Sequence, residues 1–91
     1  MELKDLEDKK QVDILQAKIV SFLDEETIAS GAKVQRAIIE DSSGQAILKI
    51  WNEQIGEFSE GDEIVIQKGY SYLFKDEMVV SSGKFGTLKK L

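Results

Sequence analysis

Aromatic side chains with cations close to them in the sequence are the residues best able to bind a ligand. Tyr70, Tyr72 and Phe74 occupy every second position, so on a strand they share one face. Trp51, the only tryptophan, follows Lys49 at the same spacing in a stretch that also alternates. Nucleic-acid bases stack on aromatic rings, and cations neutralise the phosphates between them. The combination indicates a surface for single-stranded nucleic acid.

Three more cations are predicted to lie on this surface: Arg36, Lys68 and Lys75. Each residue also has an ordinary structural interpretation. Trp51 could roof the core, Phe74 could close one end of a barrel, and tyrosine favours strands while its hydroxyl stays in water. Single lysines are typical of a solvated surface. The joint pattern favours binding, because four of the seven aromatic residues then lie outside the predicted core.

The composition excludes several other kinds of site. The chain has no cysteine and no histidine, which excludes disulfides, thiolate nucleophiles, zinc fingers and a histidine base. The acidic run at Asp24, Glu25 and Glu26 lacks converging ligands for a metal, so we expect a solvated loop there. Phe85 fits an anchor and a binding residue equally well. We therefore predict no enzyme activity, cofactor, metal or small-molecule substrate.

No apolar run reaches the length of a membrane span, and no signal-peptide core follows Met1. We expect a soluble cytoplasmic protein without membrane contact. The net charge of −5 argues against a general nucleic-acid binder. However, the first 31 residues hold four lysines and eight acids, whereas the rest holds eight cations and nine acids. Local positive potential is what a binding face needs, and the later part of the chain can provide it.

Short strands must position these residues. Alternation predicts strands over residues 12–23, 33–40, 45–51, 63–74 and 78–81. On the third strand, Leu48 and Ile50 face the core, while Lys49 and Trp51 face outward. Five strands around so small a core favour a closed barrel over a two-sheet sandwich, because closure removes exposed edges.

The connections carry their own signals. Residues 24–31 are predicted to be a loop, and residues 41–44 a tight turn with a positive φ at Gly44. A slip in the alternation at Val20 predicts a bulge and a sharp bend. Gly69 inside a long strand predicts a bend or a close approach of backbone.

Apolar anchors outside the strands are expected to cover the core. Leu3 and Leu6 predict a short helical turn at the N-terminus, and Ile55 and Phe58 predict another between the third and fourth strands. Residues 83–91 are predicted to be a basic tail held by its two leucines, Leu88 and Leu91.

An ordered set of short motifs resembles a known family. The set comprises Asp41-Ser42-Ser43-Gly44, Leu48-x-Ile50-Trp51-Asn52, Gly61-Asp62, Gly69-Tyr70-x-x-x-Phe74-Lys75 and Ser82-Gly83-Lys84. In this order it is similar to the OB-fold single-stranded-DNA-binding domains of archaeal replication protein A and to simpler proteins of that type. The resemblance implies an all-β, five-stranded Greek-key OB-fold barrel with a short helical turn between strands 3 and 4. It covers residues 12–91 as an OB-fold domain and leaves residues 1–11 as an N-terminal cap or linker edge.

The resemblance also implies roles for aromatic residues. Trp51, Tyr70 and Phe74 match the family's base-stacking positions. Some relatives carry an aromatic residue where this chain has Ser81, and Tyr72 is a candidate to replace that missing platform.

Basic residues and partners follow from the same resemblance. Lys33, Arg36 and Lys49 match the family's phosphate-contacting region, and Lys84 is a further candidate. The implied partner is single-stranded DNA, in replication and repair at the nucleoid. Other domains or subunits of a replication protein A-like assembly are further implied partners, because archaeal members usually contain several such domains.

Two other functions stay open at this point. One is an OB domain used for protein contacts or assembly, which would not lose Trp51 fluorescence on titration with oligo-dT. The other is RNA binding, which competition between DNA and RNA would reveal, because only a reader of the 2′-hydroxyl prefers RNA.

Overall fold

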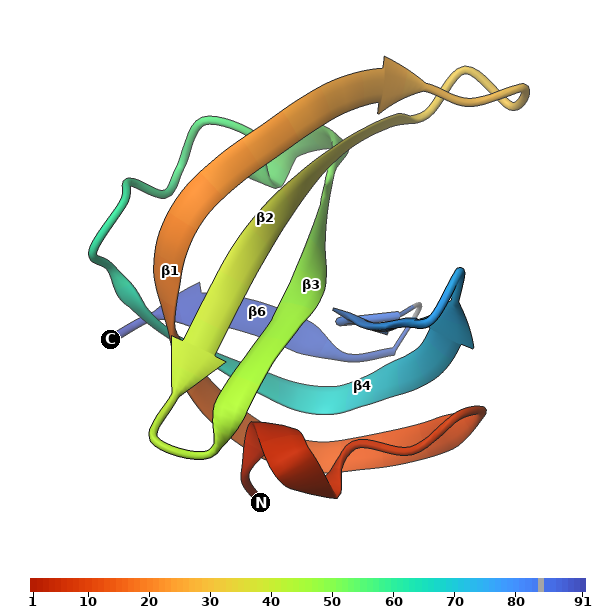
Figure 1. Ribbon diagram of the computed structural model, residues 1–91. Coiled ribbons are helices and arrows are strands. Elements are labelled where there is room, and N and C mark those ends of the chain that lie inside the picture. The colour runs from red at the N-terminus through yellow and green to blue at the C-terminus, as the bar shows by residue number, and fades with distance from the viewer. Residues whose placement is uncertain (84) are drawn as a thin grey trace.

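Six strands and two single 3-10 turns make up the secondary structure across the described residues (Figure 1). The structure is a computed structural model, and it describes residues 1–83 and 85–91. The elements in chain order are η1 (Leu3–Asp5), β1 (Lys10–Thr27), β2 (Lys33–Asp41), β3 (Gly44–Trp51), η2 (Asn52–Gln54), β4 (Glu63–Phe74), β5 (Glu77–Ser81) and β6 (Thr87–Lys90).

Five of the strands close into a ring. The hydrogen-bonded order is β1-β2-β3-β5-β4, and β1 pairs with β4 to complete the circle. The pairings within the ring are antiparallel except between β3 and β5, which run parallel. The predicted closed, five-stranded, all-β barrel is therefore confirmed.

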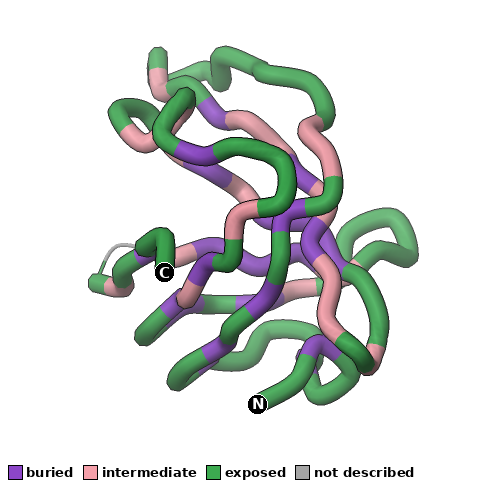
Figure 2. Tube along the Cα trace, turned by 90° about the vertical axis from the view of Figure 1, so that its left-hand side faces the viewer, coloured by how far each residue is buried: buried purple, intermediate pink, exposed green. Residues whose placement is uncertain are grey.

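The core fills the inside of this ring. Alternation along the strands places one set of apolar side chains inward. Buried and more exposed residues accordingly alternate along much of the trace in Figure 2. As predicted, Leu48 and Ile50 are fully buried on β3. The largest fully buried side chains include Leu15, Ile19, Ile39, Leu48, Ile50, Ile64, Ile66 and Val80.

The first strand bends strongly and is longer than predicted. Its pairing with β2 shifts register between Ile19 and Ser21, which confirms the bulge expected near Val20. The loop predicted for residues 24–31 is wrong in its first half, because β1 continues to Thr27. Pairing with β2 supplies the hydrogen bonds that this acidic stretch cannot provide alone. The result is a hairpin that projects from the barrel in Figure 1.

The basic tail contains an unpredicted strand. β6 pairs with the first half of β4, in register from Ile64 opposite Lys90 to Gln67 opposite Thr87. Leu88 is buried, as expected, but Leu91 is 66% exposed, so the prediction of a second anchor is wrong. A strand of four residues with two lysines has little local signal, and its pairing with β4 decides its conformation.

Two connections differ in detail from their prediction. The turn at residues 41–44 exists, but the predicted positive φ at Gly44 is wrong. The predicted helical turn after β3 is present as η2, but it ends directly before its expected anchor Ile55. Ile55 and Phe58 nevertheless pack against the core.

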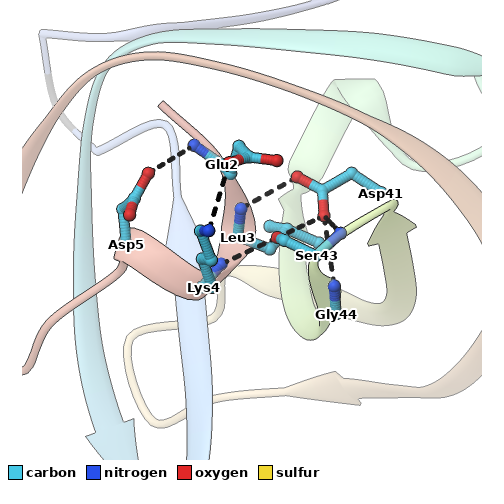
Figure 3. Close-up of polar contacts among 7 residues, drawn as sticks. All are labelled: Glu2, Leu3, Lys4, Asp5, Asp41, Ser43 and Gly44. Carbon is cyan, nitrogen blue, oxygen red and sulfur yellow. Dashed lines mark hydrogen bonds and ion pairs between the residues drawn. The ribbon is translucent and has the colours of Figure 1, made fainter.

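Asp41 closes that turn and also holds the N-terminal segment (Figure 3). Its Oδ1 accepts hydrogen bonds from Ser43 N at 2.7 Å, Ser43 Oγ at 2.6 Å and Gly44 N at 3.2 Å. Its Oδ2 accepts one from Leu3 N at 2.9 Å, at the start of η1. Desolvation acts to raise the pKa of Asp41, but these hydrogen bonds outweigh it and the pKa is lowered. Leu3 and Leu6 are buried, which confirms the predicted helical turn over the core.

Candidate nucleic-acid interface

Three strands bring the predicted binding residues onto one face. Lys49 on β3 lies opposite Ser81 on β5, and Ser81 lies opposite Tyr70 on β4. Because residues two apart share a face, Trp51 joins Lys49 and Tyr72 joins Tyr70. The outer face of β3, β5 and β4 therefore carries the predicted aromatic surface.

Lys49 links the aromatic rings of two strands. Its Nζ lies 5.8 Å from the ring centroid of Trp51 and 5.3 Å from that of Tyr72. The rings of Tyr70 and Tyr72 are 6.4 Å apart between centroids, with an interplanar angle of 33°. These distances lie within the range of cation–π and aromatic contacts. One cation and three rings thus form a continuous surface, here called the platform.

The platform residues keep substantial contact with solvent. Tyr70 is 44% exposed, and Trp51 and Tyr72 are half-buried. As predicted, Trp51 lies outside the fully buried core that contains its neighbour Ile50. These residues therefore keep solvent-accessible surface without any opening of the barrel.

A groove of about 580 Å³ lies beside the platform. Its lining residues come from the β1–β2 hairpin, from β3 and β5, and from the end of β4. In Figure 1 the hairpin and the end of β4 extend to the same side of the barrel. Lys49 and Tyr72 belong to both the platform and the groove. The lining residues are Glu26, Ile28, Val34, Arg36, Ile47, Lys49, Tyr72, Phe74, Lys75, Glu77 and Val79.

Three predicted binding residues join Lys49 and Tyr72 in this groove. Phe74 is 53% exposed, and Lys75 Nζ lies 5.4 Å from its ring centroid. Arg36 lines the wall that β2 provides. The rings give flat apolar surface and the cations give positive charge, as binding of a single strand requires.

Carboxylates share the groove with these cations, and the sequence analysis missed them as site residues. Glu26 and Glu77 line it from opposite walls. Asp24 lies near Arg36, with 4.0 Å between Asp24 Oδ2 and Arg36 Nη2, and Arg36 Nε is buried without a hydrogen-bond partner. Ile28 at the hairpin tip was also missed. These carboxylates and Ile28 lie near the ends of the β1–β2 and β4–β5 hairpins, and this position in the sequence is the signal that could have identified them.

Two other predicted cations, Lys33 and Lys68, lie apart from the groove lining. Lys33 and Arg36 are separated by an odd number of positions on β2, so their side chains point to opposite faces of the strand. The backbone N–H of Lys33 donates to Asn52 Oδ1 at 2.9 Å. Lys68 adopts a positive φ of 54° beside Gly69 and is exposed. The predicted contact by Lys84 lies outside the described residues.

Ser81 stands at the position where some relatives were expected to carry a stacking aromatic ring, but its side chain has a different role. The side chain is buried, and its Oγ accepts a hydrogen bond of 2.9 Å from Trp51 Nε1. The backbone N–H of Gly83 also donates to this oxygen, at 3.3 Å. The position therefore supports a neighbouring ring instead of presenting one.

Across residues 1–83 and 85–91, no group of three or more acidic side chains is arranged to hold a metal ion. Within the same part of the chain, no helix has the length and apolar character needed to cross a membrane.

Comparison with protein families gives a match over nearly the whole chain. Residues 7–90 match the family described as single-stranded DNA binding protein Ssb-like, OB fold. A comparison with curated proteins finds no match.

Solved structures with the same fold include several archaeal domains. The replication factor A related protein from Methanobacterium thermoautotrophicum has a TM-score of 0.82 at 18% identity, covering 100% of this chain and 89% of its own. The OB domain of Ta0387 from Thermoplasma acidophilum has a TM-score of 0.80 at 16% identity, covering 100% and 85%. The second OB-fold domain of replication protein A from Methanococcus maripaludis has a TM-score of 0.78 at 17% identity, covering 100% and 93%. These likenesses confirm the predicted OB fold.

Proposed function

Since the chain belongs to the Ssb-like OB-fold family of single-stranded DNA binding proteins, we propose that it binds single-stranded DNA on the platform and in the groove beside it. The observation that carries the proposal is the position of Lys49 between the rings of Trp51 and Tyr72. A cation next to two solvent-accessible rings allows one nucleotide to stack and its phosphate to be neutralised at the same place.

In the proposed complex the rings contact bases and the cations contact phosphates. Bases stack on Trp51, Tyr70, Tyr72 and Phe74, each contributing about 1–3 kcal/mol per base. Arg36, Lys49 and Lys75 contact phosphates in the groove, and three further cations are proposed to contact phosphates as well. These three are Lys33, Lys68 and Lys84.

The biological setting that we propose follows from the family. The chain serves as one domain of a replication protein A-like factor in DNA replication and repair, in the cytoplasm at the nucleoid. Residues 12–91 form the binding domain and residues 1–11 its cap or linker edge. Other domains or subunits of such an assembly are its protein partners. The domain itself catalyses no reaction.

Fluorescence titration with oligo-dT tests this function directly. Trp51 is the only tryptophan, so its emission reports on the platform alone. We expect stacking on a base to quench this emission, with half-saturation at micromolar oligonucleotide. Duplex DNA of the same length is the control, because its bases are already stacked on each other. A titration with no quenching and no binding at low salt contradicts the proposal, and preference for RNA over DNA of equal sequence contradicts its DNA specificity.

The carboxylates of the groove favour a second candidate, a contact with a basic protein segment. Glu26 and Glu77 repel phosphate but complement lysine or arginine. Under this alternative, the same aromatic face meets a partner chain, and the protein does not bind a ~12-nucleotide oligo-dT at low salt.

A further inference from the structure

We propose that Ser81 is a positioning residue for DNA binding: its buried hydroxyl fixes the indole of Trp51 on the platform before a base arrives. The inference rests on the proposed function, because it assumes that Trp51 stacks on a base. It assigns a role to a residue that does not itself touch the ligand.

The contact between the two side chains is short and directional. Trp51 Nε1 donates to Ser81 Oγ at 2.9 Å, within the ordinary range for an N–H···O hydrogen bond. Ser81 is only 9% exposed, so water competes weakly for the hydroxyl. The indole N–H is a donor without acceptor capacity, so this bond determines which edge of the ring faces β5.

The hydroxyl is itself held in place. Gly83 N–H donates to Ser81 Oγ at 3.3 Å, from two residues along the chain. The backbone of Ser81 is paired on both sides, with Lys49 on β3 and with Tyr70 on β4. An acceptor fixed in this way can orient a ring, whereas a mobile surface acceptor could not.

The second contact of the indole is weaker and less directional. Lys49 Nζ lies 5.8 Å from the centroid of the Trp51 ring and reaches it through a flexible four-carbon chain. Lys49 must also be free to meet a phosphate if it neutralises DNA. Orientation by Ser81 therefore lets Lys49 turn to the ligand while the ring stays in position.

Preorganisation of this kind affects affinity through entropy. A ring that is already fixed loses less rotational freedom when a base stacks on it. Immobilising one side chain on binding costs about 0.5–1.5 kcal/mol, so a ring that is not held beforehand should bind about two- to tenfold more weakly.

Two variants of Ser81 test the inference. Ser81→Ala removes the acceptor, and Ser81→Thr keeps a hydroxyl on a residue that favours strands. Binding of a fluorescently labelled oligo-dT is measured by anisotropy at a temperature at which circular dichroism reports each variant folded. We expect the alanine variant to bind about two- to tenfold more weakly and the threonine variant to bind within about twofold of the parent. We also expect tryptophan emission of the free alanine variant to depolarise more, since its indole moves more freely.

A double-mutant cycle with Trp51→Phe separates positioning from general damage. Phenylalanine keeps a ring that stacks but has no N–H to donate to Ser81. If Ser81 acts through the indole, Ser81→Ala should change the affinity of the Trp51→Phe protein by less than about 1.5-fold. An equal loss in both backgrounds overturns the inference, and so does an alanine variant that binds as tightly as the parent.

Trp51→Ala distinguishes failure of the inference from failure of the proposed function. If this variant, still folded, binds oligo-dT as tightly as the parent, Trp51 does not stack and the function proposed for the platform fails with it. If it loses affinity while Ser81→Ala does not, the platform binds DNA and only the role of Ser81 is wrong.

Discussion

Gly69 on β4 lies directly against the backbone of Ser81 on β5. A Cβ atom added to Gly69 would be 2.6 Å from the carbonyl oxygen of Ser81 and 2.7 Å from Ile66 Cγ2. The close backbone approach predicted for this glycine is therefore confirmed. Because Ser81 also accepts the hydrogen bond from Trp51, the contact that brings β4 next to β5 also sets the position of the platform.

Gly69→Ala should damage both the fold and the platform. The added methyl forces β5 or Ile66 to move, and overpacking of this kind typically costs about 1–3 kcal/mol of the free energy of unfolding. Urea denaturation measures the loss, and a shift in Trp51 emission reports the displacement of Ser81. Gly44→Ala is the matched control, because nothing lies within 4 Å of a Cβ there and its φ is not positive. Equal stability of the Gly69→Ala variant and the parent would contradict the close packing.

Trp51→Ala should weaken DNA binding far more than folding. The ring is only half-buried, whereas one stacking platform is worth about 1–3 kcal/mol, or roughly tenfold to a hundredfold in affinity. Anisotropy with labelled oligo-dT gives the affinity, and urea denaturation gives the stability. A variant that unfolds, but whose remaining folded fraction binds normally, would show that Trp51 is a structural residue.

The salt dependence of binding should be shallow. Arg36, Lys49 and Lys75 line the groove, so about three or four phosphate contacts are within reach. Each neutralised phosphate on a single strand contributes about 0.7 to the slope, which gives about −2 to −3 for log K against log salt. Affinity for one such domain should be on the order of micromolar at moderate salt, with a bias toward flexible pyrimidine runs. Tight binding to duplex DNA with a steep slope would indicate a different, phosphate-tracking surface.

Asp24→Asn should strengthen binding to DNA. The Asp24 carboxylate lies 4.0 Å from the Arg36 guanidinium and repels an incoming phosphate. Its side chain is largely exposed, so the expected gain is modest, about two- to threefold, with a slope steeper by up to about 0.7. Glu57→Gln is the control, since it makes the same charge change at a depression beside β6. If both variants gain equally, net charge and not the contact with Arg36 is responsible.

Asp41→Asn should destabilise the protein at neutral pH but not in strong acid. The folded-state pKa of Asp41 is lowered from 3.8, so its stabilising effect is complete above that value. The effect disappears as the pH falls below 3.8 and through the folded-state pKa, because protonation weakens the four hydrogen bonds that Asp41 accepts. Loss of the carboxylate should cost about 1–3 kcal/mol at pH 7. Urea denaturation curves, recorded about every half pH unit from about pH 7 to about pH 2.5, give the difference in the free energy of unfolding between parent and variant.

The control for this prediction is Asp13→Asn, which replaces an exposed carboxylate on β1. It should change the free energy of unfolding by less than about 0.5 kcal/mol at any pH in this range. A difference between the parent and Asp41→Asn that is the same at every pH would contradict the role assigned to the charge.

The strand faces were readable from the sequence because side-chain direction has a period of two. This local rule places Leu48 and Ile50 inside and Lys49 and Trp51 outside, whatever the strand pairs with. The bulge near Val20 was readable for the same reason, because an extra residue in a strand breaks the period.

Strand ends were predicted less well because pairing extends them. The stretch up to Thr27 has the composition of a loop, yet its register with β2 continues to Lys33. The short strand β6 likewise depends on β4 for its hydrogen bonds. At residues 41–44 the side chain of Asp41 closes the turn, so no positive φ at Gly44 is needed.

By itself, the sequence determined which side chains face outward, and therefore that rings and cations share a surface. Only the tertiary structure decided which of them meet. The bond between Trp51 and Ser81 spans 30 residues, and it exists because β3 and β5 are neighbours in the barrel. Glu26 and Glu77 face one groove because closure of the ring brings two hairpin ends to the same side. The alternation of side chains along a strand and the local composition determine structure over only a few residues. The order of strands around a barrel follows instead from the packing of the whole core.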